Sequence, residues 1–167
     1  MRTLIRWRDG AARETTDSFV SIEDDEAAPA GDVIVSFARF QAEGDLLLGG
    51  DRRVGVRVGP EDAVEALAYD LPRIALIALV FPKFRDGRAY SAAMILRTRL
   101  DFTGELRAVG EVLLEQAPFM IRCGFDSFEP ADGTGAELWG KAARRFRHVY
   151  QRAADDREPA FIARLAS

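Results

Sequence analysis

Residues 74–81 read IALIALVF, an uninterrupted apolar run in an otherwise mixed sequence. A strand with one solvated face alternates apolar and polar side chains, whereas a strand covered on both faces is apolar throughout. We therefore predict that residues 74–81 form a central strand with both faces buried. Strands of this kind are typical of parallel sheets, whose crossover connections place helices against the sheet.

Strand and helix signals alternate on both sides of this run. Apolar residues recur at helical spacing between the strand candidates, while Pro60 marks a helix start and Pro118 a helix break or kink. The predicted strands are residues 54–58, 74–81, 105–109 and 125–128, and the predicted helices are residues 60–70, 89–100, 111–122 and 139–152. About four such units predict an α/β domain with a mostly parallel sheet, either an open sheet or a half-barrel.

The N-terminal region has a different pattern. Residues 3–7 and 18–22 are short β-like runs that we expect to form an irregular hairpin, and residues 23–32 read as an acidic loop. Residues 33–40 suit either a strand or the start of a short helix. The predicted division of the chain is an N-terminal β-rich segment with its loop (1–32), an α/β domain (33–152) and a C-terminal tail (153–167).

The composition excludes several classes of function. A chain of 167 residues suits one domain, and its formal net charge of −4 gives no reason to expect a nucleic-acid partner. No apolar run approaches the roughly 18 residues of a membrane span, and no signal-peptide region is recognisable, so we expect a cytoplasmic protein. Cys123 is the only cysteine, which excludes an intrachain disulfide. Its place near a helix end favours a small buried residue over a nucleophile.

The first candidate site is the loop that follows the central strand. Lys83, Arg85 and Arg88 fall within six residues, at the carboxyl end of a predicted strand and just before a predicted helix. Ligands of parallel α/β proteins bind at this end of the sheet, and the first N–H groups of a helix favour an anion. Arginine suits oxyanions such as sulfite, sulfate, phosphate or carboxylate. The alternative is that Asp86 caps the helix while the cations are solvated or paired.

The second candidate site is the strand at residues 105–109. Side chains alternate along a strand, so Glu105 and Arg107 share one face. Two opposite charges on one face of a covered strand indicate either an internal ion pair or the polar floor of a cleft. Glu111, at the start of the next helix, is placed either to reach the same cleft or to interact with the helix dipole.

The third candidate cluster is RCGFD, residues 122–126, in which we expect Asp126 to pair with Arg107 or Arg122. Together the three clusters predict one arginine-lined oxyanion site at the carboxyl ends of the strands. Its predicted ligand-binding residues are Lys83, Arg85, Arg88, Arg107, Arg122 and Asp126. Catalytic residues stay unassigned, with Asp86, Glu105 and Glu111 as candidates.

Motifs for common cofactors do not occur in the sequence. No G-x-G-x-x-G follows a strand, and there is no G-x-x-x-x-G-K-[ST]. A lone histidine, His148, and the lone Cys123 cannot supply a zinc cage. We therefore predict no metal and no cofactor bound by the chain itself, and the sequence leaves open whether the protein is an enzyme.

Three motifs in order resemble a bacterial family known as domain of unknown function 934. They are FPKFRDGRAYS (residues 81–91), GELRAVGEVL (104–113) and RCGFD (122–126), and the resemblance covers about residues 54–129. Genes of this family typically lie beside those for sulfite reductase and sulfate assimilation. The resemblance therefore implies a supporting role in reductive sulfur metabolism. Glu111 and Glu115 depart from the family pattern, in which aspartates are usual, so no role that needs tight carboxylate geometry is carried over to them.

These observations leave three functions open. The first is an accessory protein of assimilatory sulfate or sulfite reduction that acts by contact with sulfite reductase or another enzyme of that pathway. The second is a small oxyanion-binding protein or enzyme that uses the arginines named above. The third is a structural or oligomerisation module whose charged motifs are internal ion pairs. The sequence does not fix the oligomeric state, and a homo-oligomer stays open.

Overall fold

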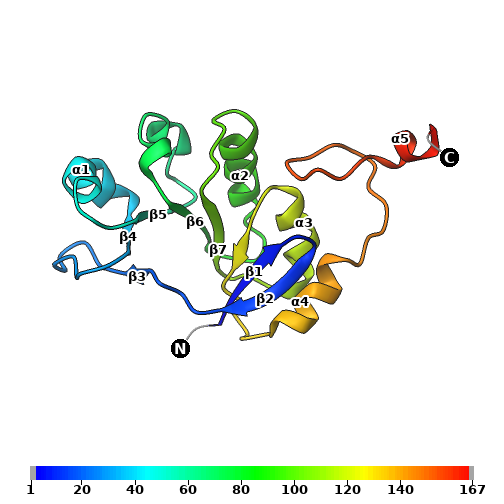
Figure 1. The fold of residues 1–167 in the computed structure, drawn as a ribbon, viewed down its shortest axis with the longest axis horizontal. Helices are drawn as coiled ribbons and strands as arrows, with labels where there is room; N and C mark the ends of the chain where they lie inside the picture. Colours follow the sequence, from blue (N-terminus) through cyan, green and yellow to red (C-terminus); the bar gives the residue numbers. More distant parts are fainter. Residues whose placement is uncertain (1–2, 166–167) are drawn as a thin grey trace.

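The structure is a computed structural model that describes residues 3–165. Its strands form one curled, open sheet in the order β2-β1-β8-β7-β6-β5-β4-β3 (Figure 1). The strands are β1 (Leu4–Arg8), β2 (Ala11–Thr15), β3 (Val20–Ser21), β4 (Val33–Ser36), β5 (Val54–Val58), β6 (Leu76–Phe81), β7 (Glu105–Gly110) and β8 (Ser127–Phe128). The fold is mixed α/β, and the curled sheet is a half-barrel.

Strands β3 to β8 lie beside one another in chain order, and each neighbouring pair is parallel. The hairpin β1–β2 adds two antiparallel strands, because β1 pairs with β8 through Ile5–Phe128 and Arg6–Ser127. The predicted α/β class is therefore confirmed. The predicted N-terminal β-rich segment supplies both edges of the sheet, since β2 and β3 are its outermost strands.

The described helices connect these strands and continue beyond the last one. The α-helices are α1 (Phe37–Leu48), α2 (Arg88–Thr98), α3 (Ala117–Arg122), α4 (Ala136–Ala143) and α5 (Ala160–Leu165), and the 3₁₀ helices are η1 (Val64–Leu67), η2 (Leu71–Arg73) and η3 (Leu114–Gln116). Ser36 ends β4 and caps α1, because its Oγ accepts a 3.0 Å hydrogen bond from the N–H of Arg39. Residues 33–40 therefore form both a strand and a helix start. No described helix has the length and apolar character needed to cross a bilayer.

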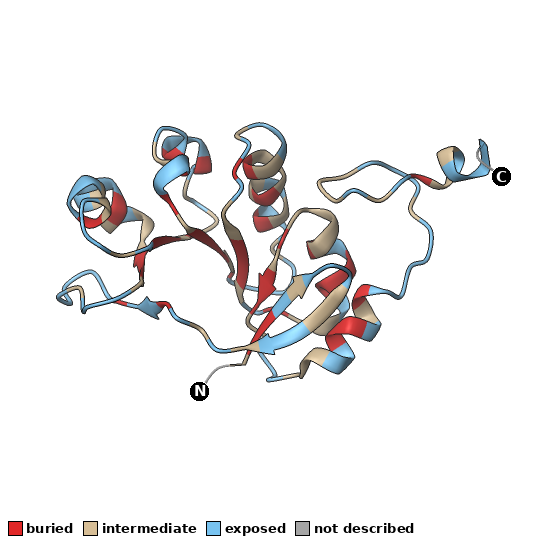
Figure 2. Cartoon of the chain, in the orientation of Figure 1, coloured by how far each residue is buried: buried red, intermediate tan, exposed pale blue. Residues whose placement is uncertain are grey.

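The main core lies between the helices and one face of the sheet. Ile77, Leu79 and Phe81 of β6 belong to it, as do Leu106 and Ala108 of β7. Figure 2 shows the buried residues concentrated along the central strands and on the helices beside them. Since side chains alternate along a strand, residues 105, 107 and 109 of β7 face the opposite side of the sheet.

That opposite side, which we call the inner face, is covered by part of the N-terminal segment. Residues 16–19, the strap, run from β2 at one edge of the sheet toward β3 at the other (Figure 1). Phe19 of the strap packs against Leu76 and Ala78 of β6 on this face. The prediction that the central strand is buried on both faces is therefore confirmed.

The N-terminal hairpin has a different second strand from the one we predicted. Asp9 and Gly10 form its turn with φ angles of 52° and 74°, so β1 pairs with β2 instead of with residues 18–22. Two turn residues with positive φ match the twist of a tight antiparallel hairpin. Only Val20 and Ser21 of the predicted strand become β3, which pairs in parallel with β4.

Three predicted helices are shorter than predicted or of another type. Residues 60–70 contain the 3₁₀ helix η1 and no α-helix. Pro118 lies in the first turn of α3 instead of interrupting a longer helix, because a missing N–H is tolerated there. Helix α4 ends at Ala143, and residues 144–152 are irregular.

Candidate functional site

Arg107 is the centre of a charged network on the inner face. Its side chain is fully buried and forms ion pairs with Asp17 of the strap (2.5 Å), Glu105 (2.9 Å) and Glu129 (3.3 Å). Phe19 covers the guanidinium group, with Cζ 5.9 Å from the ring centroid. We call these four charged residues, Arg107 with its three carboxylates, the Arg107 network.

All five N–H groups of the Arg107 guanidinium are used within this network. Nε donates to Glu105, Nη1 donates to Asp17 and Glu129, and Nη2 donates to Asp17 and Glu105. Burial lowers the pKa of Arg107, but the ion pairs with Asp17 and Glu105 outweigh burial and raise it. Burial likewise raises the pKa of Asp17, but the hydrogen bonds from Arg107 and from the N–H of Phe19 outweigh burial and lower it. In this structure Arg107 has no donor left for an oxyanion.

Glu105 and Asp126 lie together at the amino ends of β7 and β8. Glu105 also accepts hydrogen bonds of 2.7 Å from Arg6 and from Ser127 Oγ. Asp126 pairs with Arg97 at 2.5 Å, so the predicted pairing with Arg107 or Arg122 is wrong. Both carboxylates line a pocket of about 340 Å³ at this end of the sheet.

The pKa of the Asp126 carboxyl lies above its ordinary value. Burial raises it, and the charge of Arg97 and a 2.9 Å hydrogen bond from the N–H of Leu106 offset only part of that rise. Arg97 also donates to the carbonyl groups of Phe102 and Gly124. The contacts of Asp126 and Arg97 therefore join α2 to the segment that precedes β8, which is a structural role.

The loop at residues 82–88 lies at the other end of the sheet, after β6. Arg88 pairs with Asp86 at 2.7 Å and with Glu61, and the Asp86 carboxylate also accepts a hydrogen bond from the N–H of Arg88. The hydrogen bonds from Arg88 lower the pKa of Asp86. Within residues 3–165, Lys83 and Arg85 have no ion pair.

Glu111 supports this loop from the neighbouring strand. It follows β7 directly, and its carboxylate accepts a 2.8 Å hydrogen bond from the N–H of Phe84. The structure therefore gives Glu111 a positioning contact with the loop and places it away from the Arg107 network, which lies on the inner face. The predicted site residues do not converge on one cleft: the loop residues and Glu111 are at the carboxyl ends of the strands, while Glu105 and Asp126 are at the amino ends.

Arg122 lies at a third place, at the end of α3. It forms an ion pair with Asp155 and donates to the carbonyl of Gln151, which fastens residues 151–155 to the helix. Gly124 follows with a φ of 93°, the left-handed conformation that commonly ends a helix. The neighbouring Cys123 is half-buried and not fully buried as we expected. Burial raises the pKa of its thiol, which disfavours the thiolate that a nucleophile needs.

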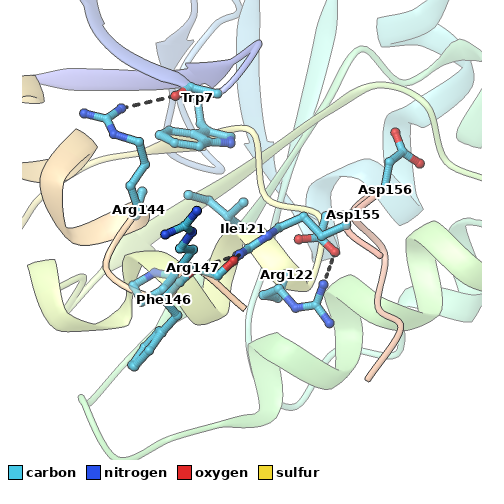
Figure 3. Close-up of a pocket in the computed structure, with 12 residues that line it drawn as sticks. Trp7, Ile121, Arg122, Arg144, Phe146, Arg147, Asp155 and Asp156 are labelled. Atoms are coloured by element: carbon cyan, nitrogen blue, oxygen red, sulfur yellow. Dashed lines mark hydrogen bonds and ion pairs between the residues drawn. The ribbon is translucent and has the colours of Figure 1, made fainter. Parts of the chain in front are cut away.

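Arg122 and Asp155 also line a pocket of about 520 Å³ between the β1–β2 turn, α3 and the chain that follows α4 (Figure 3). We call it the arginine pocket. Its apolar lining consists of Trp7, Pro118, Ile121, Ala143 and Phe146, and its charged lining consists of Arg122, Arg144, Arg147, Asp155, Asp156 and Arg157. Figure 3 shows Trp7, Arg144 and Arg147 on one side of the pocket and the Arg122–Asp155 pair on the other.

Three arginines of this pocket have no carboxylate partner within the described part of the chain. Arg144 donates to the carbonyl of Gly10 at 3.2 Å, and Arg157 donates to the carbonyls of Phe146 (2.7 Å) and Arg147 (2.9 Å). The Arg147 side chain is exposed and has no hydrogen bond or ion pair among residues 3–165. Most of the guanidinium donors of this pocket are therefore open to a ligand, unlike those of Arg107.

Comparison with family models matches residues 55–161 to the family described as bacterial protein of unknown function (DUF934). This range is more than half of the 167 residues. The chain belongs to the DUF934 family. No curated protein matches the sequence. The DUF934 match continues beyond the three motifs that suggested the family and includes most residues of the arginine pocket.

Sequence reasoning did not identify the arginine pocket of this DUF934 protein. The run at residues 144–148 contains three arginines, but we placed it on a continuous helix, which would spread the charges around a cylinder. Helix α4 ends at Ala143, so Arg144 and Arg147 instead lie on the irregular chain beside Trp7. Gly140, close to the end of α4, is the only local signal for an early helix end that the sequence offered.

No group of three or more histidine, cysteine, aspartate or glutamate side chains in residues 3–165 is arranged to hold a metal ion. The described carboxylates instead gather around arginines, as in the Arg107 network.

Proposed function

We propose that this DUF934 protein is an accessory protein of assimilatory sulfite or sulfate reduction that acts by contact with a larger enzyme, with sulfite reductase as the first candidate. The typical gene neighbourhood of the family supports the pathway. The contact is supported by the apolar surface of the C-terminal arm, by which we mean residues 144–165.

The C-terminal arm exposes apolar side chains that it does not pack against its own domain. Helix α5 has no buried residue, and Phe161 and Leu165 are 59% and 86% exposed. Figure 1 shows α5 well beyond the sheet and the other helices. At the start of the arm, the exposed rings of Phe146 and Phe119 lie 6.0 Å apart. Removing apolar surface of this kind from water is favourable, and a partner protein that covers it gains that free energy.

In this proposal the redox step belongs to the partner. The chain has one thiol, Cys123, and one thiol cannot cycle through an intramolecular disulfide. The raised pKa of Cys123 also reduces its thiolate fraction near neutral pH. An accessory role that positions or stabilises the reductase needs neither a thiolate nor a cofactor in this chain.

The test is co-purification of the full chain with sulfite reductase from cells grown on sulfate. We expect the wild-type chain to retain the reductase and the Phe161→Asp/Leu165→Asp variant to lose it. Leu46→Asp/Tyr69→Asp is the matched control, because both residues are exposed apolar side chains remote from the arm. If the wild-type chain never retains the reductase and a deletion strain grows normally on sulfate, the proposal is wrong.

Binding of a small oxyanion at the loop after β6 is a second candidate function, favoured by the unpaired Lys83 and Arg85. Sulfite or sulfate should then raise the thermal midpoint of the wild-type chain, and Lys83→Ala/Arg85→Ala should abolish the rise. Lys141→Ala is a suitable control, because Lys141 is paired with Glu137 on the exposed face of α4. A midpoint that no oxyanion changes would exclude this candidate.

A further inference from the structure

We infer that the arginine pocket binds an amphipathic organic anion, that is, a ligand with a ring-sized apolar body and an anionic group such as a carboxylate, phosphate or sulfonate. The apolar body would lie against Trp7 and Ile121, and the anionic group would be held by Arg144, Arg147 and Arg157. The pocket shares Phe146 with the apolar surface of the arm. The two proposals are still tested separately, because the pocket is probed through Arg144 and Arg147 and the partner contact through Phe161 and Leu165.

The size and lining of the pocket suit an organic ligand better than an inorganic ion. Its volume of about 520 Å³ lies within the range of roughly 300–1,000 Å³ found for small-molecule sites. Pro118 and Ala143 are buried in its wall, and Trp7 and Phe146 offer aromatic surface to a flat apolar group. A hydrated inorganic oxyanion would leave this apolar lining without a partner.

The charges of the pocket favour an anion. The pocket is lined by four arginines and two carboxylates: Asp155 forms an ion pair with Arg122 and also interacts with the charge of Arg157, and Asp156 is the other carboxylate. Guanidinium groups bind carboxylate, phosphate and sulfonate through charge-assisted hydrogen bonds. Arg144, Arg147 and Arg157 form no ion pair with a carboxylate among the described residues, so an incoming anion displaces no internal carboxylate from them.

The wall of the pocket also has an unused hydrogen-bond acceptor. Asp155 Oδ2 is buried and has no hydrogen-bond partner in the described chain, while Oδ1 is held by Arg122. A buried polar atom without a partner is unfavourable. A ligand that carries an N–H or O–H group beside Asp155 would supply the missing donor, which further favours an organic molecule with both polar and apolar parts.

The test is a fluorescence titration of the full chain with a matched pair of probes. The first is 8-anilino-1-naphthalenesulfonate, and the second is N-phenyl-1-naphthylamine, which has the same aromatic body without the sulfonate. We expect the sulfonate probe to bind at least about tenfold more tightly, and Arg144→Ala/Arg147→Ala to remove that advantage. Arg152→Ala is the control, because Arg152 lies in the same arm but does not line the pocket.

Several results would overturn the inference. Equal binding of both probes would show an apolar groove without anion selectivity. Full displacement of the sulfonate probe by an equal concentration of sulfate would show an inorganic oxyanion site. Unchanged affinity in the Arg144→Ala/Arg147→Ala variant, with an unchanged thermal midpoint, would place the probe elsewhere. Binding of the probe to α5 is identified by loss of the signal in Phe161→Asp/Leu165→Asp, and that result also overturns the inference.

Discussion

The Arg107 network and the arginine pocket use the same side chain in opposite ways. Arg107 donates all five of its N–H groups to carboxylates of its own chain, whereas Arg144, Arg147 and Arg157 have no carboxylate partner within residues 3–165. The comparison shows that an arginine conspicuous in the sequence is not for that reason a binding residue. What decides its use is whether the fold has already supplied its partners.

Burial explains the difference between the two regions. Arg107 lies on a central strand under the strap, where an unpaired charge would be strongly unfavourable, so the fold brings three carboxylates to it. Arg144 and Arg147 follow the end of a helix and are exposed, so water solvates them when no ligand is bound. Pairing of arginine with carboxylates is therefore required in the Arg107 network and optional in the arginine pocket.

The largest expected effect comes from breaking the Arg107 network at its centre. Arg107→Met should lower the free energy of unfolding by about 3 kcal/mol or more, because three partly buried carboxylates lose their common partner. Urea unfolding at pH 7 measures this change. Arg147→Ala, by comparison, should change the same quantity by no more than about 0.5 kcal/mol. Equal effects in the two variants would contradict the distinction between the regions.

Removing one carboxylate should have a smaller, pH-dependent effect. Asp17→Asn should destabilise the protein by about 2 kcal/mol at pH 7, since it weakens charged hydrogen bonds to Arg107. The folded-state pKa of Asp17 lies below its ordinary value of 3.8, so its stabilisation is complete above that value and is lost as the pH falls through the folded pKa.

The measurement is urea unfolding of the wild-type chain and Asp17→Asn at pH 6 and at pH 3. The wild-type chain should lose more stability than the variant between these two pH values, because Asp17 takes up a proton more readily in the unfolded chain than in the folded one and the variant lacks this carboxyl group. A constant difference between the two proteins at both pH values would argue against ionisation of Asp17 as the cause.

The smallest expected effect is on the affinity of the arginine pocket for an anion when a carboxylate of its lining is removed. Asp156→Asn removes an exposed carboxylate charge from the lining of the arginine pocket and so strengthens the attraction of the pocket for an anion. The affinity for 8-anilino-1-naphthalenesulfonate should rise roughly twofold, in line with about 0.5 kcal/mol for a solvated charge. Fluorescence titration measures this change in affinity. A weaker affinity in this variant would show that Asp156 helps to hold the ligand.

The sequence was most informative where local pattern and packing agree. The apolar run at residues 74–81 predicted a strand buried on both faces, and β6 is one, because a strand whose side chains are all apolar gains free energy only when both of its faces are covered. An internal ion pair between Glu105 and Arg107 was one of our two interpretations of the strand at residues 105–109, and the structure contains this ion pair. The α/β class followed from the alternation of such elements.

The features that we did not predict depend on contacts between residues that are distant in the sequence. Asp17 and Glu129 could not be connected to Arg107 from spacing, since Asp17 is 90 residues away and reaches Arg107 only because the strap crosses the inner face. Nothing in the sequence distinguished Arg97 from the many other arginines as the partner of Asp126. The pocket was missed because its position depends on where α4 ends, and helix ends are poorly determined by periodicity.

The strap also affects the order in which the parts of the chain fold. The hairpin before it docks through β1 against β8, a strand that is synthesised long after β1. The hairpin therefore cannot complete its docking until the chain as far as β8 is present. Because distant pairings form slowly, we expect closure of the N-terminal segment over Arg107 to be among the last events of folding.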